Sequence, residues 1–301
     1  MKPKIIFWGS PAFALPSLES AHQLAEITAV ITRPDSQQGR GLQAKSTLIK
    51  KRAQELGLKV LTPEKLDQTF IEQLRPYLPA TFLIVAYGKI IPQAVLDLSQ
   101  LPSLNIHPSL LPKYRGPSPI QSAILNGEIQ TGVSLMQLDA QMDHGPIVKQ
   151  ISVAIEPTET SEQLHDKLAI ISAQVLQGGL PEYLKSSIMA KAQDDSQATI
   201  CKLIKKEDGL IDWNFSAEKV YNLIRAFNPW PGSYFDWNGR HLKIIEAIPA
   251  TIENKRNPGE FYRQEDRLLI NCSDKPLQIK RLQLEGKKEM TATEFMNGYL
   301  R

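Results

Sequence analysis

The chain has 301 residues, of which 42% are hydrophobic and 22% are charged, and its formal net charge is +3. These values are typical of a globular protein of one or two domains with a full core, and the charge is too small to indicate nucleic-acid binding by itself. The longest apolar run, residues 82–86, is far too short to span a bilayer, and the two cysteines at 201 and 272 exclude a disulfide scaffold or a cysteine-rich zinc site. A reducing, cytoplasmic setting without membrane contact fits these features.

The first part of the chain alternates between strand-like and helix-like segments. Short apolar runs that predict buried parallel strands lie at residues 4–9, 26–32, 58–63 and 81–88. Helical spacing of apolar residues is found at 10–25, where Ser10 is a candidate N-cap, and at 47–57. This alternation predicts a Rossmann-like, doubly wound α/β sheet with right-handed crossovers.

The middle of the chain completes this pattern. Residues 131–138 and 146–155 predict an antiparallel pair of strands at one edge of the sheet, and residues 161–184 predict a long amphipathic helix. The polar stretch at 186–205 lacks clear periodicity, and we interpret it as a linker.

The C-terminal part has a different character. Residues 217–227 predict a helix, and short strands follow with turn signals at Pro231-Gly232 and Asn238-Gly239. A small OB-like β-barrel with one helix fits this pattern. We therefore divide the chain into an α/β domain over residues 1–185, a linker over 186–205 and a β-barrel domain over 206–301.

A strand pattern ends in an unusual set of polar residues at LNIHPSLLPKYRG, residues 104–116. Asn105 and His107 are two apart on this strand, so they point to the same side, and the carboxyl ends of strands are where open α/β sheets bind ligands. An amide and an imidazole that converge there could hold a carbonyl oxygen as it becomes an oxyanion. The same residues would also suit structural hydrogen bonding alone.

Such a site needs a carboxylate that orients the histidine or takes a proton. Asp139 and Asp143 both follow the strand at 131–138, and the residues themselves leave the choice between them open.

Other common chemistries have less support in the sequence. No Gly-x-Gly-x-x-Gly follows the first strand, which argues against a dinucleotide-dependent oxidoreductase, and no Gly-Lys-Ser/Thr phosphate loop is present. Ser109 lacks the Gly-x-Ser-x-Gly context of a nucleophilic serine. The five histidines show no metal-ligand spacing, so we expect no metal.

Several long motifs in the same order are similar to one known family. NIHPSLLPKYRGPSPIQSAILNG, followed by TGVSLMQLDAQMDHGPIV, resembles the formyltransferases that use 10-formyltetrahydrofolate. Further segments of that family are similar to IIFWGSPAFA (5–14), ITRPDSQQGRG (31–41), VAYGKIIP (85–92) and IRAFNPWPGSYF (224–235). The resemblance therefore covers nearly the whole chain.

The resemblance implies an activity and a set of catalytic residues. It implies transfer of a formyl group from 10-formyltetrahydrofolate to the free α-amine of initiator methionyl-tRNA, for translation initiation, by a monomer without a metal. Asn105 and His107 would stabilise the oxyanion, and Asp143 matches the family's catalytic carboxylate, which orients His107 and assists proton transfer. The segments implied to contact the folate are matched by Ser109, Leu110, Leu111, Pro112, Tyr87 and Gly88.

The resemblance also implies contacts with tRNA. Arg40, with Lys45 further on, lies in a loop that resembles one placed near the acceptor end of the tRNA, although the family commonly has Lys-Lys-Leu where this chain has Leu-Gln-Ala at 42–44. In the C-terminal domain, the residues that could hold the phosphate backbone are Lys280, Lys287 and Lys288, which could equally be solvated surface. Trp230, Tyr234 and Trp237 could stack on bases, but a place in the core is the competing interpretation.

Related activities remain open at this point. A folate-dependent formyltransferase for a sugar amine or for glycinamide ribonucleotide, a formyl-folate hydrolase and a non-catalytic folate-binding protein would all share the first domain. The C-terminal motif at 226–235 favours the tRNA-acting branch of the family.

Overall fold

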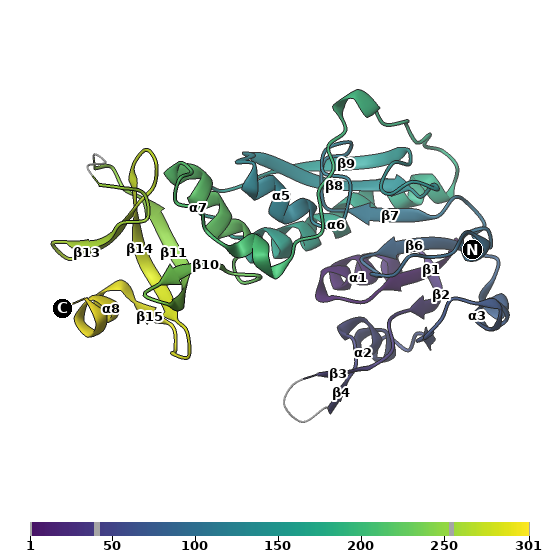
Figure 1. Cartoon of the computed structure of the whole chain (residues 1–301). Helices are drawn as coiled ribbons and strands as arrows, with labels where there is room; N and C mark the ends of the chain where they lie inside the picture. The colour runs from purple at the N-terminus through teal and green to yellow at the C-terminus, as the bar shows by residue number, and fades with distance from the viewer. Residues whose placement is uncertain (1, 39–42, 253–255, 301) are drawn as a thin grey trace. The chain divides into compact units, whose positions relative to one another are not determined.

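The computed structural model describes residues 2–38, 43–252 and 256–300 (Figure 1). They form two compact units. The first consists of Met1–Gly116, Thr131–Val153 and His165–Ile200, and the second of Pro117–Gln130, Ala154–Leu164 and Cys201–Arg301. The units therefore interleave along the chain, whereas the sequence-based division used continuous ranges.

The first unit is built on a seven-stranded sheet with the order β5-β2-β1-β6-β7-β8-β9 (Figure 1). The strands are β1 (Lys4–Gly9), β2 (Glu26–Ile31), β5 (Val60–Leu61), β6 (Thr81–Val85), β7 (Leu104–His107), β8 (Gln130–Gln137) and β9 (Ile147–Ala154). The pairs from β5 to β7 are parallel, and β8 runs antiparallel to β7. This confirms the doubly wound α/β sheet. Because the chain winds outward from β1 to β5 and then returns to β6, the carboxyl ends of β1 and β6 form the switch point at which such sheets bind ligands.

Helices and short elements complete the first unit. The α-helices are α1 (Leu15–Leu24), α2 (Leu48–Glu55), α3 (Gln68–Leu74), α4 (Gln93–Leu96) and α6 (Ser161–Leu184), whose first residues belong to the second unit. Three 3-10 turns lie at Ala12–Ala14, Arg75–Tyr77 and Asp195–Gln197, and β3 (Ser36–Gln38) pairs with β4 (Gln43–Lys45).

Ser10 does not cap the first helix, so that prediction was wrong. Its hydroxyl donates to the carbonyl of Tyr87 and accepts the N–H of Arg33, each at 3.3 Å. The helical segment instead starts with the 3-10 turn at Ala12–Ala14. Ser10 makes hydrogen bonds to residues distant in sequence in place of a local helix cap. These bonds connect the carboxyl ends of the neighbouring strands β2, β1 and β6.

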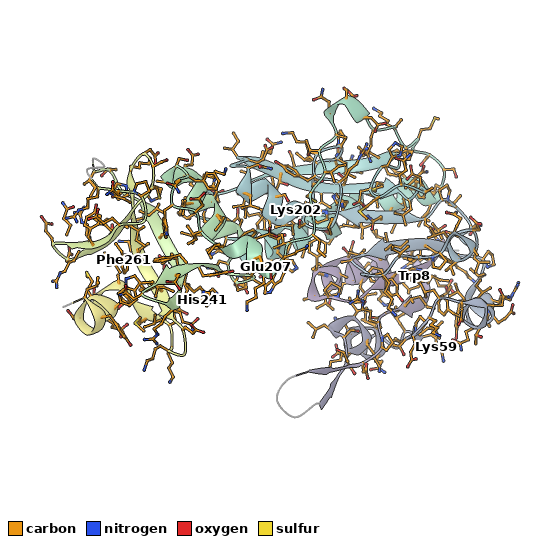
Figure 2. The ribbon with its side chains drawn as sticks, viewed as in Figure 1. Trp8, Lys59, Lys202, Glu207, His241 and Phe261 are labelled. Carbon is orange, nitrogen blue, oxygen red and sulfur yellow. The ribbon has the colours of Figure 1, made fainter. Side chains whose placement is uncertain are left out.

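An aromatic cluster fills one side of this sheet. Trp8 on β1 is fully buried and meets the rings of Phe70, Phe82 and Tyr87 at centroid distances of 5.8, 5.5 and 5.3 Å (Figure 2). Contacts of this kind are worth more than area burial alone, because ring edges meet ring faces. The cluster fixes the ends of β1 and β6 next to the switch point.

The second unit combines a six-stranded sheet with helices. Its path is β10-β11-β14-β13-β12, with β15 on β14, and the pairs are antiparallel. The elements are α5 (Pro119–Leu125), a 3-10 turn (Lys206–Gly209), α7 (Ala217–Ala226), β10 (Ser233–Trp237), β11 (Arg240–Pro249), β12 (Phe261–Gln264), β13 (Arg267–Asn271), β14 (Pro276–Leu284), β15 (Met290–Thr291) and α8 (Ala292–Tyr299). The helix α8 was not predicted, because eight residues give little helical periodicity.

The Asn238-Gly239 turn was predicted correctly. Both residues have positive φ angles, 54° and 76°, as a two-residue hairpin turn between β10 and β11 requires. Phe261, labelled in Figure 2, is partly buried and packs against Phe295 of the apolar core, with ring centroids 5.5 Å apart.

Arg225 on α7 holds the second unit together from inside. Only 8% of the residue is exposed, and its guanidinium donates to the carbonyl of Glu159 at 2.9 Å and to Oδ1 of Asn222 at 2.6 Å. Burial lowers the pKa of Arg225. We expect Arg225→Leu to reduce the free energy of unfolding by about 2–4 kcal/mol, since it removes two buried hydrogen bonds of the guanidinium.

Urea unfolding followed by tryptophan fluorescence measures this loss. Arg263→Leu is the matched control, because Arg263 is exposed on β12 and donates to a single backbone carbonyl. It should change the free energy by no more than about 0.5 kcal/mol. Equal effects of the two substitutions would contradict the structural role of Arg225.

Candidate active site

Asn105 and His107 lie on β7, between β6 and β8 in the sheet. Asn105 is partly buried beside Ile84 of β6, and His107, with 4% of its surface exposed, lies opposite Ser134 of β8. Strand alternation places both side chains on one face, as the spacing predicted.

The imidazole of His107 meets a protein oxygen on each side. Its Nε2 lies 2.9 Å from the backbone carbonyl of Tyr114, and its Nδ1 lies 3.5 Å from Oδ2 of Asp143. A carbonyl oxygen only accepts, so Nε2 carries a proton in this arrangement. The ring is thereby held between a backbone carbonyl and a carboxylate, which together fix its orientation.

Asp143 is held through both its side chain and its main chain. Its Oδ2 accepts the N–H of Gly116 at 2.9 Å, and its carbonyl accepts a hydrogen bond from Gln193 at 2.8 Å. Asp143 has a positive φ of 52°. Gly116 has a φ of 117°, which in practice only glycine adopts. Two tight turns, distant in sequence, therefore bring this carboxylate to His107.

Asp139 has other partners. Its Oδ2 lies 2.6 Å from Nδ1 of His144, and its Oδ1 accepts the N–H of Gln141 at 2.9 Å. The structure therefore places Asp143 beside His107, while Asp139 stabilises its own loop.

The His144–Asp139 pair predicts a pH-dependent stability. The hydrogen bond to Asp139 raises the pKa of His144 above its usual 6.5, with a further contribution from Asp195. The folded chain then binds this proton more tightly than the unfolded chain, so the pair stabilises the protein below about pH 6.5 and the effect is lost as pH rises through the raised pKa.

We expect the melting temperatures of native protein and His144→Gln to differ more at about pH 5.5 than at about pH 8.5. Calorimetry over this range measures the difference. Asp139→Asn should show the same trend, because it removes the other partner. A difference that does not change with pH would contradict the pairing.

The segment after His107 is fixed by one buried hydroxyl. Ser134 Oγ donates to the carbonyl of Ser109 at 2.6 Å and accepts from the N–H of Leu111 at 3.2 Å and from Gln150 Nε2 at 2.8 Å. Ser109 and Leu111 are buried, whereas Leu110 and Pro112 are partly exposed. Within the segment 109–112, which is expected to contact a folate, Leu110 and Pro112 therefore have side-chain surface available to a ligand.

The loop after β6 offers mainly backbone to a ligand. The ring of Tyr87 is buried against Trp8, and burial raises the pKa of its hydroxyl. Gly88, Lys89 and Ile90 are exposed, and a guanidinium N–H of Arg33 donates to the carbonyl of Gly88. Tyr87 and Gly88 can thus contribute backbone groups at the carboxyl end of the sheet.

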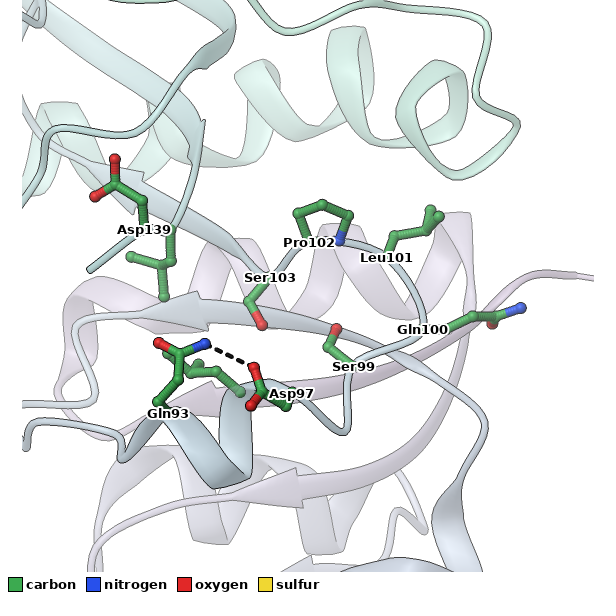
Figure 3. Close-up of a pocket in the computed structure, with 10 residues that line it drawn as sticks. Gln93, Asp97, Ser99, Gln100, Leu101, Pro102, Ser103 and Asp139 are labelled. Carbon is green, nitrogen blue, oxygen red and sulfur yellow. Dashed lines mark hydrogen bonds between the residues drawn. The ribbon is translucent and has the colours of Figure 1, made fainter. Parts of the chain in front are cut away.

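A polar pocket of about 370 Å³ lies where β7 begins and β8 ends, at the opposite end of β7 from His107 (Figure 3). It is lined by Gln93, Leu96, Asp97, Ser99, Gln100, Leu101, Pro102, Ser103, Leu138 and Asp139. On one wall of the pocket, Gln93 at the start of α4 donates to Asp97 at the end of this helix, at 2.7 Å. Asn105, His107 and Asp143 do not line this pocket, so it is separate from the reacting groups.

The candidate tRNA-binding residues lie in both units. Arg40 is outside the described residues, and of Lys45 the structure describes the backbone of β4. Lys280 is partly buried on β14, whereas Lys287 and Lys288 are exposed in the turn that leads to β15.

The three aromatic residues divide between core and surface. Trp237 packs against Phe295 at 5.1 Å between centroids, and Tyr234 contacts His241 at 5.2 Å. Trp230 is 56% exposed, so it is the one of the three that presents a ring to solvent.

Four residues of the site were missed in the sequence. Tyr114 contributes a carbonyl, Gly116 an N–H, and Ser134 and Gln193 hydrogen bonds that shape the loops. Gly116 carried a signal, since a glycine that ends a polar motif often marks a positive φ. The contact with Tyr114 could not be predicted, because it uses the backbone carbonyl, which every residue type has.

The site has the groups that an acyl-transfer enzyme needs. An amide and an imidazole backed by a carboxylate can stabilise a developing oxyanion and move a proton, at the edge of the sheet where ligands bind. In the described residues no group of three or more His, Cys, Asp and Glu could hold a metal ion, and none of their helices could cross a membrane.

Comparison with known proteins gives the family. Residues 9–180 match the formyl transferase family, and residues 203–300 match the formyl transferase C-terminal domain. The chain belongs to the formyl transferase family.

Curated relatives match along their whole length. The chain is 38% identical to a methionyl-tRNA formyltransferase of Caldanaerobacter subterraneus subsp. tengcongensis, over 98% of this chain and 97% of that protein. It is 40% identical to one of Koribacter versatilis, over 98% and 95% of the two chains.

Solved structures share the fold. An N-formyltransferase from Helicobacter canadensis, in complex with folinic acid and dTDP-3-aminofucose, has a TM-score of 0.71 at 20% identity, over 93% of this chain and 99% of that one. A methionyl-tRNA formyltransferase from Clostridium thermocellum has a TM-score of 0.54 at 18% identity, over 82% and 93%.

Proposed function

We propose that this protein transfers a formyl group from 10-formyltetrahydrofolate to the α-amine of initiator methionyl-tRNA. The observation that carries the proposal is full-length similarity to methionyl-tRNA formyltransferases, including the C-terminal domain. The His107–Asp143 pair supports it, because amine formylation needs an oxyanion stabiliser and a proton acceptor. Cys201 and Cys272 are both buried, which suits a reducing cytoplasm, in which the protein acts as a monomer.

The proposed chemistry proceeds through addition and elimination at the formyl carbon. The substrate amine forms a bond to this carbon, and the carbonyl electron pair moves onto the formyl oxygen. Asn105 donates to that oxygen. The formyl oxygen also competes with the Tyr114 carbonyl for the Nε2–H of His107, in line with catalytic hydrogen bonds that tighten only when substrates bind.

Asp143 completes the reaction. Its charge keeps His107 oriented, and it accepts the proton that the attacking amine loses. When the bond from carbon to the folate nitrogen breaks, Asp143 returns this proton to that nitrogen, and tetrahydrofolate leaves. Ser109, Leu110, Leu111, Pro112, Tyr87 and Gly88 form the folate side of this site.

We assign the chemistry to residues 1–185, tRNA binding to 206–301, and a connecting role to 186–205. Arg40 and Lys45 contribute from the first part, and Lys280, Lys287 and Lys288 from the second. The exposure of Lys287 and Lys288 supports the second group.

Combined Lys287→Ala and Lys288→Ala should raise KM for the tRNA and leave KM for the folate unchanged. The dependence of log KM on log salt should also become shallower by about 0.7–0.9 for each lost phosphate contact. Steady-state kinetics at several salt concentrations measure this. Lys59→Ala, an exposed lysine on the first unit, is the control (Figure 2). Equal salt slopes in all three proteins would remove these lysines from the tRNA surface.

A panel of amine acceptors tests the proposed substrate. We expect a kcat/KM for methionyl-tRNA at least about 10³ times that for free methionine or a dTDP-linked amino sugar, since tRNA contacts contribute binding energy that small amines lack. Preference for the amino sugar would retain the formyl-transfer chemistry and overturn the RNA assignment.

A further inference from the structure

Gln193 contacts the loop that carries Asp143 without touching a reacting group. It lies in the polar segment after α6, and its Nε2 donates to the carbonyls of Asp143 and Gly145, each at 2.8 Å. An amide nitrogen has two N–H groups, so both are used by the two carbonyls that flank His144.

Arg115 fixes the orientation of this amide. The Nε of Arg115 donates to Oε1 of Gln193 at 3.0 Å, and because a guanidinium can only donate, the amide oxygen must face it. A second guanidinium nitrogen donates to Asp195 at 2.7 Å, so Arg115 is held by two partners. The side chain of Arg115 is 12% exposed, whereas that of Asp195 is 66% exposed.

The segment around Gln193 is itself attached to the sheet. Lys191 pairs with Ile147 of β9, and the N–H of Arg115 donates to the carbonyl of Thr199 at 2.9 Å. The stretch predicted as a linker is therefore attached to the first unit by backbone hydrogen bonds on both sides of Gln193. Its polar composition supplies hydrogen bonds to the site.

The loop needs such support because Asp143 adopts an unfavourable backbone conformation. A non-glycine residue at φ 52° lies in a sparsely populated backbone region and persists where surrounding contacts fix it. The contact of the carboxylate with Gly116 N–H fixes the side chain, and Gln193 fixes the main chain on both sides of His144.

We infer that Gln193, oriented by Arg115, is a positioning residue that holds the Asp143 loop in the geometry needed for formyl transfer. The inference rests on the proposed function. A displacement of the carboxylate by about 1 Å is enough to lower the rate about 10²-fold. Loss of Gln193 should therefore lower kcat and leave substrate binding unchanged.

Gln193→Leu removes the three hydrogen bonds of the amide and keeps its approximate size. We expect kcat for formyl transfer to fall by about 10–100-fold, with KM for folate and tRNA changed by less than about threefold. Gln197→Leu is the matched control, because Gln197 lies four residues further on in the same segment and is exposed. A Gln193→Leu protein with native kcat would overturn the inference.

A double-mutant cycle separates positioning from general damage. If Gln193 acts through Asp143, then Gln193→Leu should lower the single-turnover rate by less than about threefold in an Asp143→Asn background. A full additional 10–100-fold loss in that background would mean that Gln193 acts by another route, and would also overturn the inference.

Hydrogen exchange gives a readout that is independent of activity. Backbone amides of the peptide over 139–147 should exchange at least about tenfold faster in Gln193→Leu than in native protein and in Gln197→Leu, while peptides from β1 and β6 stay unchanged. Unchanged exchange over 139–147 would overturn the inference. Faster exchange in a protein without formyl transfer would instead retain the positioning and reject the proposed function.

Discussion

His107→Ala is expected to lower kcat for formyl transfer by at least about 10³-fold, with folate binding retained. The structure places the imidazole of His107 between Asp143 and the Tyr114 carbonyl, and its loss removes both a donor to the formyl oxygen and the partner of the carboxylate. Single-turnover transfer to methionyl-tRNA measures the chemical step without interference from product release.

Two controls accompany this measurement. His107→Ala opens a buried space and removes the hydrogen bond to the Tyr114 carbonyl, so thermal unfolding must show that the variant is folded at the assay temperature. Folate affinity, measured by titration, should change by less than about threefold. A folded variant with a rate within about tenfold of native would remove His107 from the chemistry.

Asp143→Asn should cost about 10²–10⁴-fold in kcat, whereas Asp139→Asn should cost less than tenfold. The asparagine in place of Asp143 keeps an oxygen that accepts the N–H of Gly116, so the turn is retained and the charge beside His107 is lost. Asp139 is the matched control, because it lies in the same loop and its carboxylate faces His144.

The two aspartates make this comparison decisive. Both variants lose one negative charge from the same loop, so a general electrostatic effect would lower both rates alike. A larger loss for Asp139→Asn than for Asp143→Asn would contradict the proposed role of Asp143. Steady-state kinetics at a fixed pH near 7.5 are sufficient, provided that both variants remain folded at that pH.

The sheet could be predicted from sequence because a buried strand is a short run of apolar residues that can be recognised locally. β1, β2 and β6 are short apolar runs between turn residues, and helices α2, α6 and α7 follow the predicted ranges closely. The Asn-x-His pair could be recognised for a similar reason, since its spacing on a strand fixes a shared face.

The choice of carboxylate could not be made from residue types. It depends on a φ of 52° at Asp143 and on an N–H from Gly116, 27 residues earlier in the chain. Such contacts form only once β7 and β8 have paired, so no local pattern records them. The resemblance to a known family pointed to Asp143, and the geometry then gave a physical reason.

The segment at 186–205 illustrates a second limit of sequence reasoning. It lacks apolar periodicity, which is why it was interpreted as a linker, but Lys191 and Ile200 bridge to backbone of the first unit. The interaction uses main-chain groups and the amide of Gln193, none of which needs a hydrophobic pattern. Polar segments near a site can therefore be ordered by the site itself.

The most direct test follows a labelled formyl group from 10-formyltetrahydrofolate. The protein, with methionyl-tRNA as acceptor, should place the label on the methionine amine, with one tetrahydrofolate formed for each formyl group, and hydrolysis of the ester should release N-formylmethionine. Uncharged tRNA should take up no label. Label released as free formate, or no transfer by a protein that binds the folate, would contradict the proposed function.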